Sequence, residues 1–353
     1  MAKHCCFVTG ATGLVGREVV ARLLASPEVE RVYVLARGAM NGSHHAAHPL
    51  QGDLRLDGLG IAPDVRARLA REVATVVHLA ANTSFSQPLD EARATNTDGT
   101  RRLLELSADW THVSRWVYVS TAFVAGLRTG TTLENDSLPV SGWANAYEQS
   151  KAEAETLVRA ARPDWVIARP ATIVCDDSSG RISQMNAVHR ALRLYFGGLA
   201  PMLPCTDQSL VDVVTTEYSA RGIARAALAP DIARHTFHFC AGAGAMPLGE
   251  LLDVTYDAFL RAPAWRRKGI VRPVRTDLGT YRLFEQAIHD VGSDRVRQAL
   301  RSLGHFVPHL AYPKRFATDA ADALLGDSAP PVASFWTAMV NQLVGNVPVL
   351  EAA

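Results

Sequence analysis

Tyr147 and Lys151 stand four positions apart, so both side chains face the same way if this stretch is helical. A lysine ammonium near a phenol lowers the pKa of the phenol, and the tyrosine can then exchange a proton with a carbonyl oxygen near neutral pH. In most proteins a tyrosine and a lysine at this spacing lie on the surface and have no catalytic role. Here it follows the apolar strand end Val119-Ser120-Thr121 and a glycine-rich turn further upstream. Together these features predict a catalytic group of Thr121, Tyr147 and Lys151.

The glycine-rich turn comes directly after an apolar strand and opens an amphipathic helix. Its first glycine permits a tight turn, its second lets the backbone approach a pyrophosphate, and its third lets the helix pack closely on the sheet. The free amides at the helix N-terminus then face the anion. The pattern predicts dinucleotide binding, with a purely structural strand-to-helix turn as the alternative. The residues of the predicted turn are Thr9, Gly10, Thr12, Gly13, Leu14, Val15 and Gly16.

The end of the second strand favours NADP(H) over NAD(H). Arg37 stands where an NAD-binding chain more often carries Asp or Glu. A guanidinium pairs with the 2′-phosphate and stacks on adenine, whereas a carboxylate repels that phosphate. Arg17 can add a second cation, and Asp53, followed by Leu54 at the end of the third strand, can accept from the adenine amino group. The alternative for Arg37 is a solvent-facing side chain at a strand end.

The composition predicts a soluble globular protein that handles small molecules. The chain has 353 residues, is 48% hydrophobic and 20% charged, and carries a net charge of +1 without a basic block, which argues against nucleic acid or an anionic membrane as partner. Five cysteines without a CxxC spacing fit neither a disulfide framework nor a zinc site, and favour a reducing cytoplasm. No signal peptide and no apolar run of ~20 residues are visible, so we expect a cytoplasmic protein without an integral membrane segment.

Up to Arg169 the sequence alternates β-rich apolar runs with helical patterns, which predicts an α/β fold with a doubly wound parallel Rossmann sheet. The expected strands are Cys5–Thr9, Arg31–Ala36, Pro49–Asp53, Thr75–Leu79, Trp116–Ser120 and Trp165–Ala168. The expected helices between them are Leu14–Ala25, Pro63–Arg71, Leu89–Asp109 and Ala146–Ala161.

After Pro170 the pattern becomes mostly helical and predicts a smaller C-terminal substrate-binding domain. We expect residues 1–240 to form the NADP-binding domain and 241–353 the substrate-binding domain, with part of 175–210 contributing to the substrate site. The expected elements are helices at Gly180–Gly197, Thr216–Ala229, Pro247–Leu260, Leu278–His289, Ser293–Ser302 and Pro331–Leu343, and strands at Leu210–Val214 and His235–Cys240.

Two further groups of residues have a functional and a structural interpretation. The three histidines within Gly38–His48 suggest a metal site, but without a carboxylate at ligand spacing a surface loop is favoured. An apolar acyl pocket competes with ordinary core packing for Trp143, Met185, Leu192, Tyr195, Phe196 and Met202.

Seven ordered segments make the sequence resemble the extended short-chain dehydrogenase/reductases. They are Thr9–Gly16, Gly52–Leu54, His78–Ala81, Asn96–Thr100, Val119–Gly126, Tyr147–Lys151 and Arg169–Val174. The resemblance implies that Thr121 hydrogen-bonds the substrate oxygen, Tyr147 is the acid, Lys151 holds the nicotinamide ribose and tunes Tyr147, and Asn96 supports them. It also implies that the nicotinamide is flanked by Leu79, Ala80, Ala81, Pro170, Thr172 and Ile173.

Within that family the sequence is similar to fatty acyl-CoA reductases and to carrier-protein thioester reductase domains. The run His78–Leu89, its continuation through Asn96–Leu106 and the segment Val211–Val214 carry this similarity. Ala125-Gly126 departs from the Asn-Gly or Tyr-Gly usual after the hydroxyl motif, and no motif is matched from about Leu260 onward.

The resemblance implies an NADPH-dependent reductase that converts an acyl thioester, on CoA or on an acyl carrier protein, to an aldehyde and leaves further reduction to an alcohol open. A monomer or a homodimer is expected. One alternative is a ketone or aldehyde reductase, because Thr121, Tyr147 and Lys151 suffice for it. A sugar-nucleotide epimerase or dehydratase is a further alternative, but such enzymes generally keep NAD bound and would be expected to carry an acidic residue at the position of Arg37. A non-catalytic NADP sensor usually loses Tyr147 or Lys151, and both are present.

Overall fold

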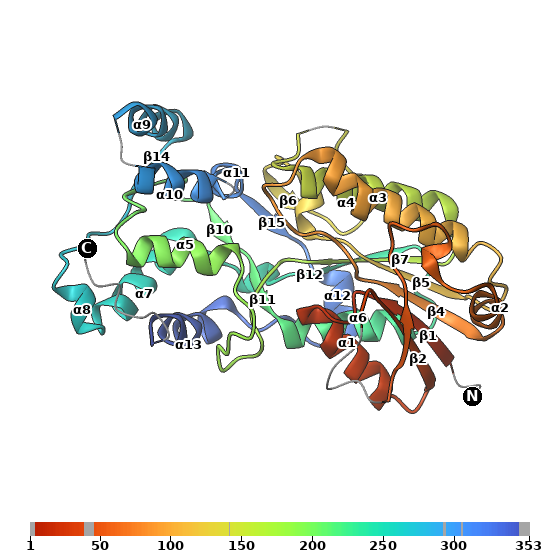
Figure 1. Ribbon diagram of the computed structural model, residues 1–353. Helices are drawn as coiled ribbons and strands as arrows, with labels where there is room; N and C mark the ends of the chain where they lie inside the picture. The colour runs from red at the N-terminus through yellow and green to blue at the C-terminus, as the bar shows by residue number, and fades with distance from the viewer. Residues whose placement is uncertain (1–3, 39–45, 141, 292–293, 305, 346–353) are drawn as a thin grey trace.

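The computed structural model describes residues 4–38, 46–140, 142–291, 294–304 and 306–345, and a seven-stranded parallel sheet forms the core of one half of the molecule (Figure 1). The strand order reverses direction at β1, so the predicted doubly wound α/β fold is confirmed. From one edge to the other the strands are β12 (His235–Phe239), β7 (Trp165–Pro170), β5 (Arg115–Val119), β4 (Val73–His78), β1 (His4–Thr9), β2 (Val29–Ala36) and β3 (His48–Gln51).

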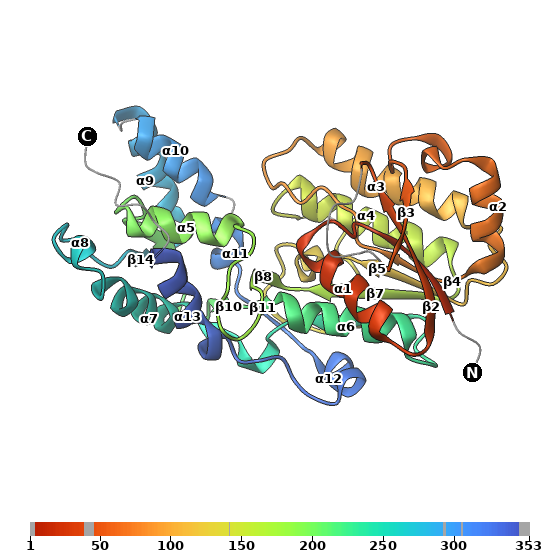
Figure 2. The ribbon, with the colours of Figure 1, turned by 60° about the horizontal axis from the view of Figure 1, so that its bottom comes forward.

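Helices cover both faces of this sheet (Figures 1 and 2). One face carries α1 (Leu14–Ala25) and α6 (Thr216–Leu228), which pack side by side, and the other carries α3 (Leu89–Leu106) and α4 (Ala146–Ala161). Alternate side chains of one strand enter different cores, since Val8 packs with the first pair of helices and Phe7 with the second. Burial on both faces explains why these strands are nearly continuous apolar runs. Helix α2 (Pro63–Glu72) and the short helix η1 (Asp57–Gly60) complete this half.

A second, mostly helical part of the chain lies beside the sheet, and we refer to it as the C-terminal lobe (Figure 1). Its core is aromatic: the ring centroids of Tyr195 and Phe196 lie 5.2 and 5.0 Å from that of Phe259, and Trp265 stacks on Phe196. The elements of the lobe are α5 (Ala187–Phe196), α7 (Leu248–Leu260), α8 (Pro263–Arg266), α9 (Leu278–Val291), α10 (Asp294–Gly304), α11 (Val307–Ala311) and α13 (Val332–Gly345), with the strand pairs β9 (Met202–Pro204) with β14 (Val274–Thr276) and β10 (Leu210–Val211) with β13 (Met246–Pro247).

The chain returns from the lobe to the sheet half after α11. Strand β15 (Lys314–Phe316) pairs in parallel with β6 (Gly130–Thr132), and α12 (Asp319–Leu325) packs against α6 and β12. Strand β8 (Thr172–Cys175) pairs with β11 (Val213–Thr215) near the junction. The expected division at residue 240 stays a prediction. A single boundary there would assign β15 and α12 to the C-terminal domain, although they pack against the sheet half.

Two expected elements differ from the structure. The helix predicted for Gly180–Gly197 begins only at Ala187, because the backbone of Asn186 is extended and its side chain caps the first turn; Gly180, with a φ of +76°, lies outside the helix. The strand predicted for Leu210–Val214 is two short strands, β10 and β11, which pair with different partners. The short helices η2 (Ala122–Ala125) and η3 (Gly242–Gly244) were not predicted.

Candidate active site

The predicted site residues gather where neighbouring parallel strands end. Thr9 ends β1, His78 ends β4 and pairs with Thr9, and Val119 ends β5 beside Ala168 of β7. Because parallel strands end at one edge of a sheet, the residues that follow them share a crevice there. The predicted turn, Leu79–Ala81, Thr121 and Pro170–Ile173 therefore lie along one edge.

The glycine-rich turn is held in a conformation that only glycine fits. Gly10 has a φ of +76°, and a Cβ on it would lie 2.6 Å from the amide nitrogen of Ala80. A Cβ on Gly16 would lie 2.1 Å from the carbonyl oxygen of Gly10. Gly13 is the N-cap of α1 and offers no side chain to cap it, so the first amides of the helix are left for a ligand. Thr12 and Gly13 are exposed, Leu14 and Val15 are half-buried, and all four can face a phosphate group through their backbone.

Buried hydroxyl and imidazole groups fix the strand ends behind this turn. A hydrogen bond of 2.6 Å joins the Thr9 hydroxyl to Nδ1 of His78, and the same hydroxyl accepts from the Ala80 amide at 3.2 Å. Nε2 of His78 meets the Thr100 hydroxyl of α3 at 2.9 Å. Burial lowers the pKa of His78 to about 3, so this imidazole is a neutral link between β1, β4 and α3.

The residues predicted for the adenosine end of the cofactor lie at the ends of β2 and β3. Arg37 follows β2 and is exposed, as is Arg17 in the first turns of α1. The amide of Gly52 donates to the carbonyl of Ala36 at 3.0 Å and holds the next residue, Asp53, near the end of β2. Asp53 accepts from the amide of Arg55 at 2.9 Å, and Leu54 is buried against Gly99 of α3. The structure thus places Arg37 and Asp53 at the end of neighbouring strands.

Asn96 joins the loop after β4 to the helix that carries Tyr147 and Lys151. Its side chain exchanges two hydrogen bonds with the backbone of Asn82, at 2.8 and 3.0 Å, and donates to the Ser150 hydroxyl at 2.9 Å. Ser150 in turn donates to the carbonyl of Tyr147 at 2.9 Å. Since Asn96 is 1% exposed, a position that supports the helix fits its geometry better than direct contact with substrate.

Thr121 and Tyr147 face each other. Thr121 is the N-cap of η2 and accepts from the amide of Phe123 at 3.3 Å, and its hydroxyl lies close enough to the Tyr147 phenol to lower the pKa of that phenol. Burial raises the pKa of Tyr147 above its ordinary value, and the hydrogen bond from Thr121 only partly opposes this. The sequence predicts that a neighbouring lysine lowers the pKa of Tyr147. The pKa is raised instead, because burial has the larger effect. The phenol therefore stays protonated at neutral pH, as an acid requires.

Lys151 is buried below the strand ends. Its ammonium donates to the carbonyl of Val119 at 2.7 Å and lies 4.1 Å from the centre of the Tyr118 ring. Burial lowers the pKa of Lys151 to about 7, and Glu155, one turn further along α4, opposes this shift. A lysine with such a pKa changes its charge in the range in which enzymes work.

Sequence reasoning missed the ion pair that supports this lysine. Glu155 is fully buried and binds the guanidinium of Arg169 through two hydrogen bonds of 2.9 and 2.8 Å. Burial acts to raise the pKa of Glu155, but Arg169 outweighs it and the pKa lies below its ordinary value. The sequence does contain a signal for this pair: Arg169 stands in an apolar strand, where a buried charge without a partner is costly, so an acidic partner could have been expected.

The remaining predicted cofactor residues flank the end of β5. The amide of Leu79 donates to the carbonyl of Thr9 at 3.2 Å, and Ala80 and Ala81 follow it. On the other side Pro170 ends β7, and Thr172 and Ile173 begin β8. Because β5 lies between β4 and β7, these two segments bracket Thr121.

The residues considered for an acyl pocket divide into two groups. Leu192, Tyr195 and Phe196 belong to the core of the C-terminal lobe and Met185 packs against it, whereas Met202 lies in β9, paired with Val274. Trp143 instead donates from its indole nitrogen to the carbonyl of Val124 at 3.2 Å, next to the loop of Thr121. Core packing explains the first group, whereas Trp143 lies near the predicted catalytic residues.

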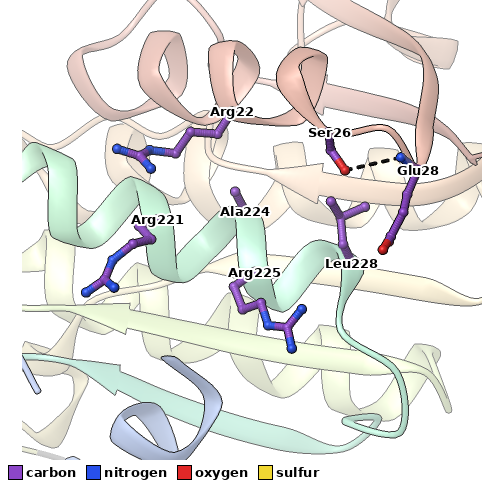
Figure 3. Close-up of a pocket in the computed structure, with 7 residues that line it drawn as sticks. All are labelled: Arg22, Ser26, Glu28, Arg221, Ala224, Arg225 and Leu228. Atoms are coloured by element: carbon purple, nitrogen blue, oxygen red, sulfur yellow. Dashed lines mark hydrogen bonds between the residues drawn. The ribbon is translucent and has the colours of Figure 1, made fainter. Parts of the chain in front are cut away.

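The hollow shown in Figure 3 lies away from these residues. It measures about 220 Å³ and is lined by side chains of α1, α6 and the turn after α1. Arg22 comes from the last turn of α1, at the opposite end from the glycine-rich turn, and pairs with Glu18 at 3.0 Å. Arg221 is held by Asp327 through two contacts of 2.7 Å. This hollow is therefore separate from the candidate site.

Metal ligands and membrane spans were also sought among the described residues. No group of three or more His, Cys, Asp or Glu suited to a metal occurs there. Most of the histidine-containing loop, including His44 and His45, lies outside the described residues. Within the described ranges no helix is both long and apolar enough to cross a membrane.

The chain matches the family described as male sterility protein over residues 8–223. It is 30% identical over 203 residues to the nonribosomal peptide synthetase inpA of Emericella nidulans, a match that covers 47% of this chain and 13% of the synthetase. It is 33% identical over 144 residues to a putative fatty acyl-CoA reductase of Drosophila melanogaster, covering 33% of this chain and 28% of the reductase. The chain thus spans well under half the length of these relatives.

Among solved structures, the terminal R domain from the myxalamid PKS-NRPS biosynthetic pathway has a similar fold. The two superpose with a TM-score of 0.77 at 23% identity, over 98% of this chain and 91% of that domain. The likeness extends through the C-terminal lobe, where the sequence offered no motif.

Proposed function

The chain belongs to the male sterility protein family within the extended short-chain dehydrogenase/reductases, and from this premise we propose that it reduces an acyl thioester with NADPH. The observation that carries the proposal is the contact between Thr121 and Tyr147 at the sheet edge, beside a turn that only glycine fits. The relatives supply the substrate class, since they are a peptide synthetase and a putative fatty acyl-CoA reductase.

The chain's own residues fit a nicotinamide dinucleotide. The backbone of the glycine-rich turn has the free amides and close approach that a pyrophosphate needs, because a Cβ at Gly10 or Gly16 would meet backbone atoms. Arg37 and Arg17 supply exposed cations for a 2′-phosphate, and Asp53 is an acceptor for adenine. The bound cofactor supplies a hydride to the carbonyl carbon of the substrate.

Thr121 and Tyr147 then act on the carbonyl oxygen of the thioester. Both hydroxyls can donate to this oxygen as negative charge develops on it, and Tyr147 delivers the proton that completes a hemithioacetal. Collapse of the hemithioacetal breaks the carbon–sulfur bond and gives an aldehyde and a free thiol. In this proposal Lys151 contributes a positive charge that favours the tyrosinate left behind, and Glu155 helps to keep this charge on the ammonium.

Other functions use the same fold but fit these residues less well. A ketone or aldehyde reductase needs only Thr121, Tyr147 and Lys151. An assay that compares thioesters with ketones distinguishes it from a thioester reductase. An NAD-dependent sugar-nucleotide enzyme would suit a carboxylate at the position of Arg37. A sensor has no use for a buried Lys151 whose pKa is lowered to about 7.

The test is NADPH consumption with thioesters of increasing acyl length, presented on CoA and on an acyl carrier protein, with free thiol measured alongside. We expect one thiol released for each NADPH oxidised in the first step, and loss of turnover with retained NADPH binding in Tyr147→Phe. Oxidation of NADPH by a ketone alone, without thiol release from any thioester, would refute the proposal. The same panel shows whether reduction stops at the aldehyde.

A further inference from the structure

The segment after α10 brings charged side chains from the C-terminal lobe to the catalytic helix. Helix α11 ends the lobe, and strand β15, which follows it, lies in the sheet half (Figure 1). The carbonyl of Pro313 accepts from the amide of Gly130 at 3.0 Å, and the amide of Ala317 donates to Thr132 at 2.9 Å. These bonds fix the segment to the loop that follows Thr121.

Glu148, the neighbour of Tyr147 in α4, is the carboxylate that this segment meets. It is 1% exposed, so its charge needs partners. The amide of Ala144 donates to it at 2.9 Å and the side chain of Asn145 at 3.0 Å. Both of these donors lie in the turn that begins α4, and neither carries a charge.

The returning chain places an imidazole and an ammonium group on the other side of Glu148. Nε2 of His309, on α11, lies 3.1 Å from Oε1 of Glu148, and the side chain of His309 is 14% exposed. Lys314 in β15 is 8% exposed and donates to the carbonyl of Tyr312 at 3.0 Å. Burial lowers the pKa of Lys314 to about 8, and the charge of Glu148 opposes this shift. Glu148 is thus enclosed by donors from the start of its own helix and by basic side chains from the returning chain.

His309 also touches the loop that carries the other catalytic hydroxyl. Its ring centroid lies 4.5 Å from that of Phe123. The amide of Phe123 donates to the Thr121 hydroxyl at 3.3 Å, and the Phe123 ring meets Phe316 of β15 edge-on. One imidazole therefore contacts the element of Tyr147 through a carboxylate and the element of Thr121 through an aromatic ring.

We propose that His309 is a positioning residue of the reaction, through which the C-terminal lobe sets the distance between Thr121 and Tyr147. The inference rests on the proposed function for the reaction that it serves. Because both hydroxyls must reach one carbonyl oxygen, a small displacement of either element lowers the rate of hydride transfer without removing the cofactor site. The packing of His309 against Glu148 and Phe123 then also sets the relative position of Thr121 and Tyr147.

Two substitutions separate the polar contact with Glu148 from the ring contact with Phe123. His309→Phe keeps a ring against Phe123 but has no polar atom to face Glu148, whereas His309→Gln keeps a polar side chain that can donate to Glu148. Glu148→Gln removes the charge from the other side. His289 on α9 is exposed beside Asp290, so His289→Phe is a matched control outside the contact.

The assay is a single turnover, in which protein loaded with NADPH is mixed with excess acyl-CoA and the loss of nicotinamide absorbance is followed. The amplitude counts competent molecules, and the rate constant reports the geometry of the site. For His309→Phe we expect a rate constant lower on the order of 10- to 100-fold, with amplitude and NADPH affinity within about twofold of the parent protein. Glu148→Gln should behave alike, and the double variant should be no slower than the worse single variant. His309→Gln should recover part of the rate.

A reduced amplitude at an unchanged rate constant would overturn the inference, because it would show a purely structural role. Additive losses in the double variant, or no recovery in His309→Gln, would also overturn it. If His309→Phe does not fold, Glu148→Gln carries the same comparison.

A parent protein inert toward every thioester refutes the proposed function instead. In that case amide hydrogen exchange still decides about His309. Faster exchange over residues 121–126 and 146–151 in the His309 variants than in the control supports positioning, and equal exchange overturns it.

Discussion

Replacing Lys151 by methionine should remove a specific dependence of stability on pH. Burial lowers the pKa of Lys151 from its ordinary 10.5 to about 7. Between these two values the unfolded chain holds a proton that the folded chain has released, so this group makes the folded state more stable as the pH rises. One proton corresponds to about 1.4 kcal/mol for each pH unit, and from about pH 7 to about pH 9 the gain is about 2 kcal/mol.

The assay is urea unfolding of the nucleotide-free protein at these two pH values. Buried cysteines work in the opposite direction, since burial raises the pKa of Cys6 to about 12 and its unfolded form ionises first. The quantity to compare is therefore the pH slope of the parent protein minus that of Lys151→Met, in which the contributions of other groups cancel. Lys268→Met, at an exposed lysine, should retain the parental slope. Parallel curves for the parent and Lys151→Met would refute the reasoning.

Three further outcomes follow from the site. Gly16→Ala should destabilise the protein by several kcal/mol, because its Cβ would lie 2.1 Å from the carbonyl oxygen of Gly10; urea unfolding measures this, and a loss below about 1 kcal/mol would contradict it. Arg169→Met should cost about 3–5 kcal/mol by leaving Glu155 charged and buried, and the double change with Glu155→Met should restore most of it in the same assay. Arg37→Ala should weaken NADPH binding about tenfold or more and leave NADH binding unchanged, as followed by fluorescence, and an equal loss for both would remove the basis for NADP preference.

The sheet and the glycine-rich turn could be predicted because their signals are local. Strands buried on both faces show as short apolar runs, and the helices between them show three- and four-residue spacing. The start of α5 could not be predicted in this way. Apolar spacing continues upstream of Ala187, but the helix begins only after Asn186, whose extended backbone and capping side chain mark the helix start, and Gly180 is held against α13, some 160 residues later in the chain.

The sequence predicts which residues make up the candidate site, and that set stays a prediction; it does not predict their pKa values. The spacing of Tyr147 and Lys151 predicts that both lie on one helix face, and the structure places them at the same sheet edge. Their pKa values depend on burial and on Glu155, which no spacing reveals. The contact of His309 with Glu148 joins positions far apart in a region without a motif, so only the folded chain could show it.

The pairing of β15 with β6 has a consequence for synthesis. Glu134 accepts hydrogen bonds from the amides of Ala320 and Ala321, which follow it by 186 and 187 residues. Closing so long a loop is slow compared with forming a helix or a neighbouring strand pair. On the ribosome the sheet can therefore assemble while the loop after Thr121 still lacks its partner. Until about residue 321 has emerged, the nascent chain has the parallel sheet but lacks the hydrogen bonds that hold the loop after Thr121.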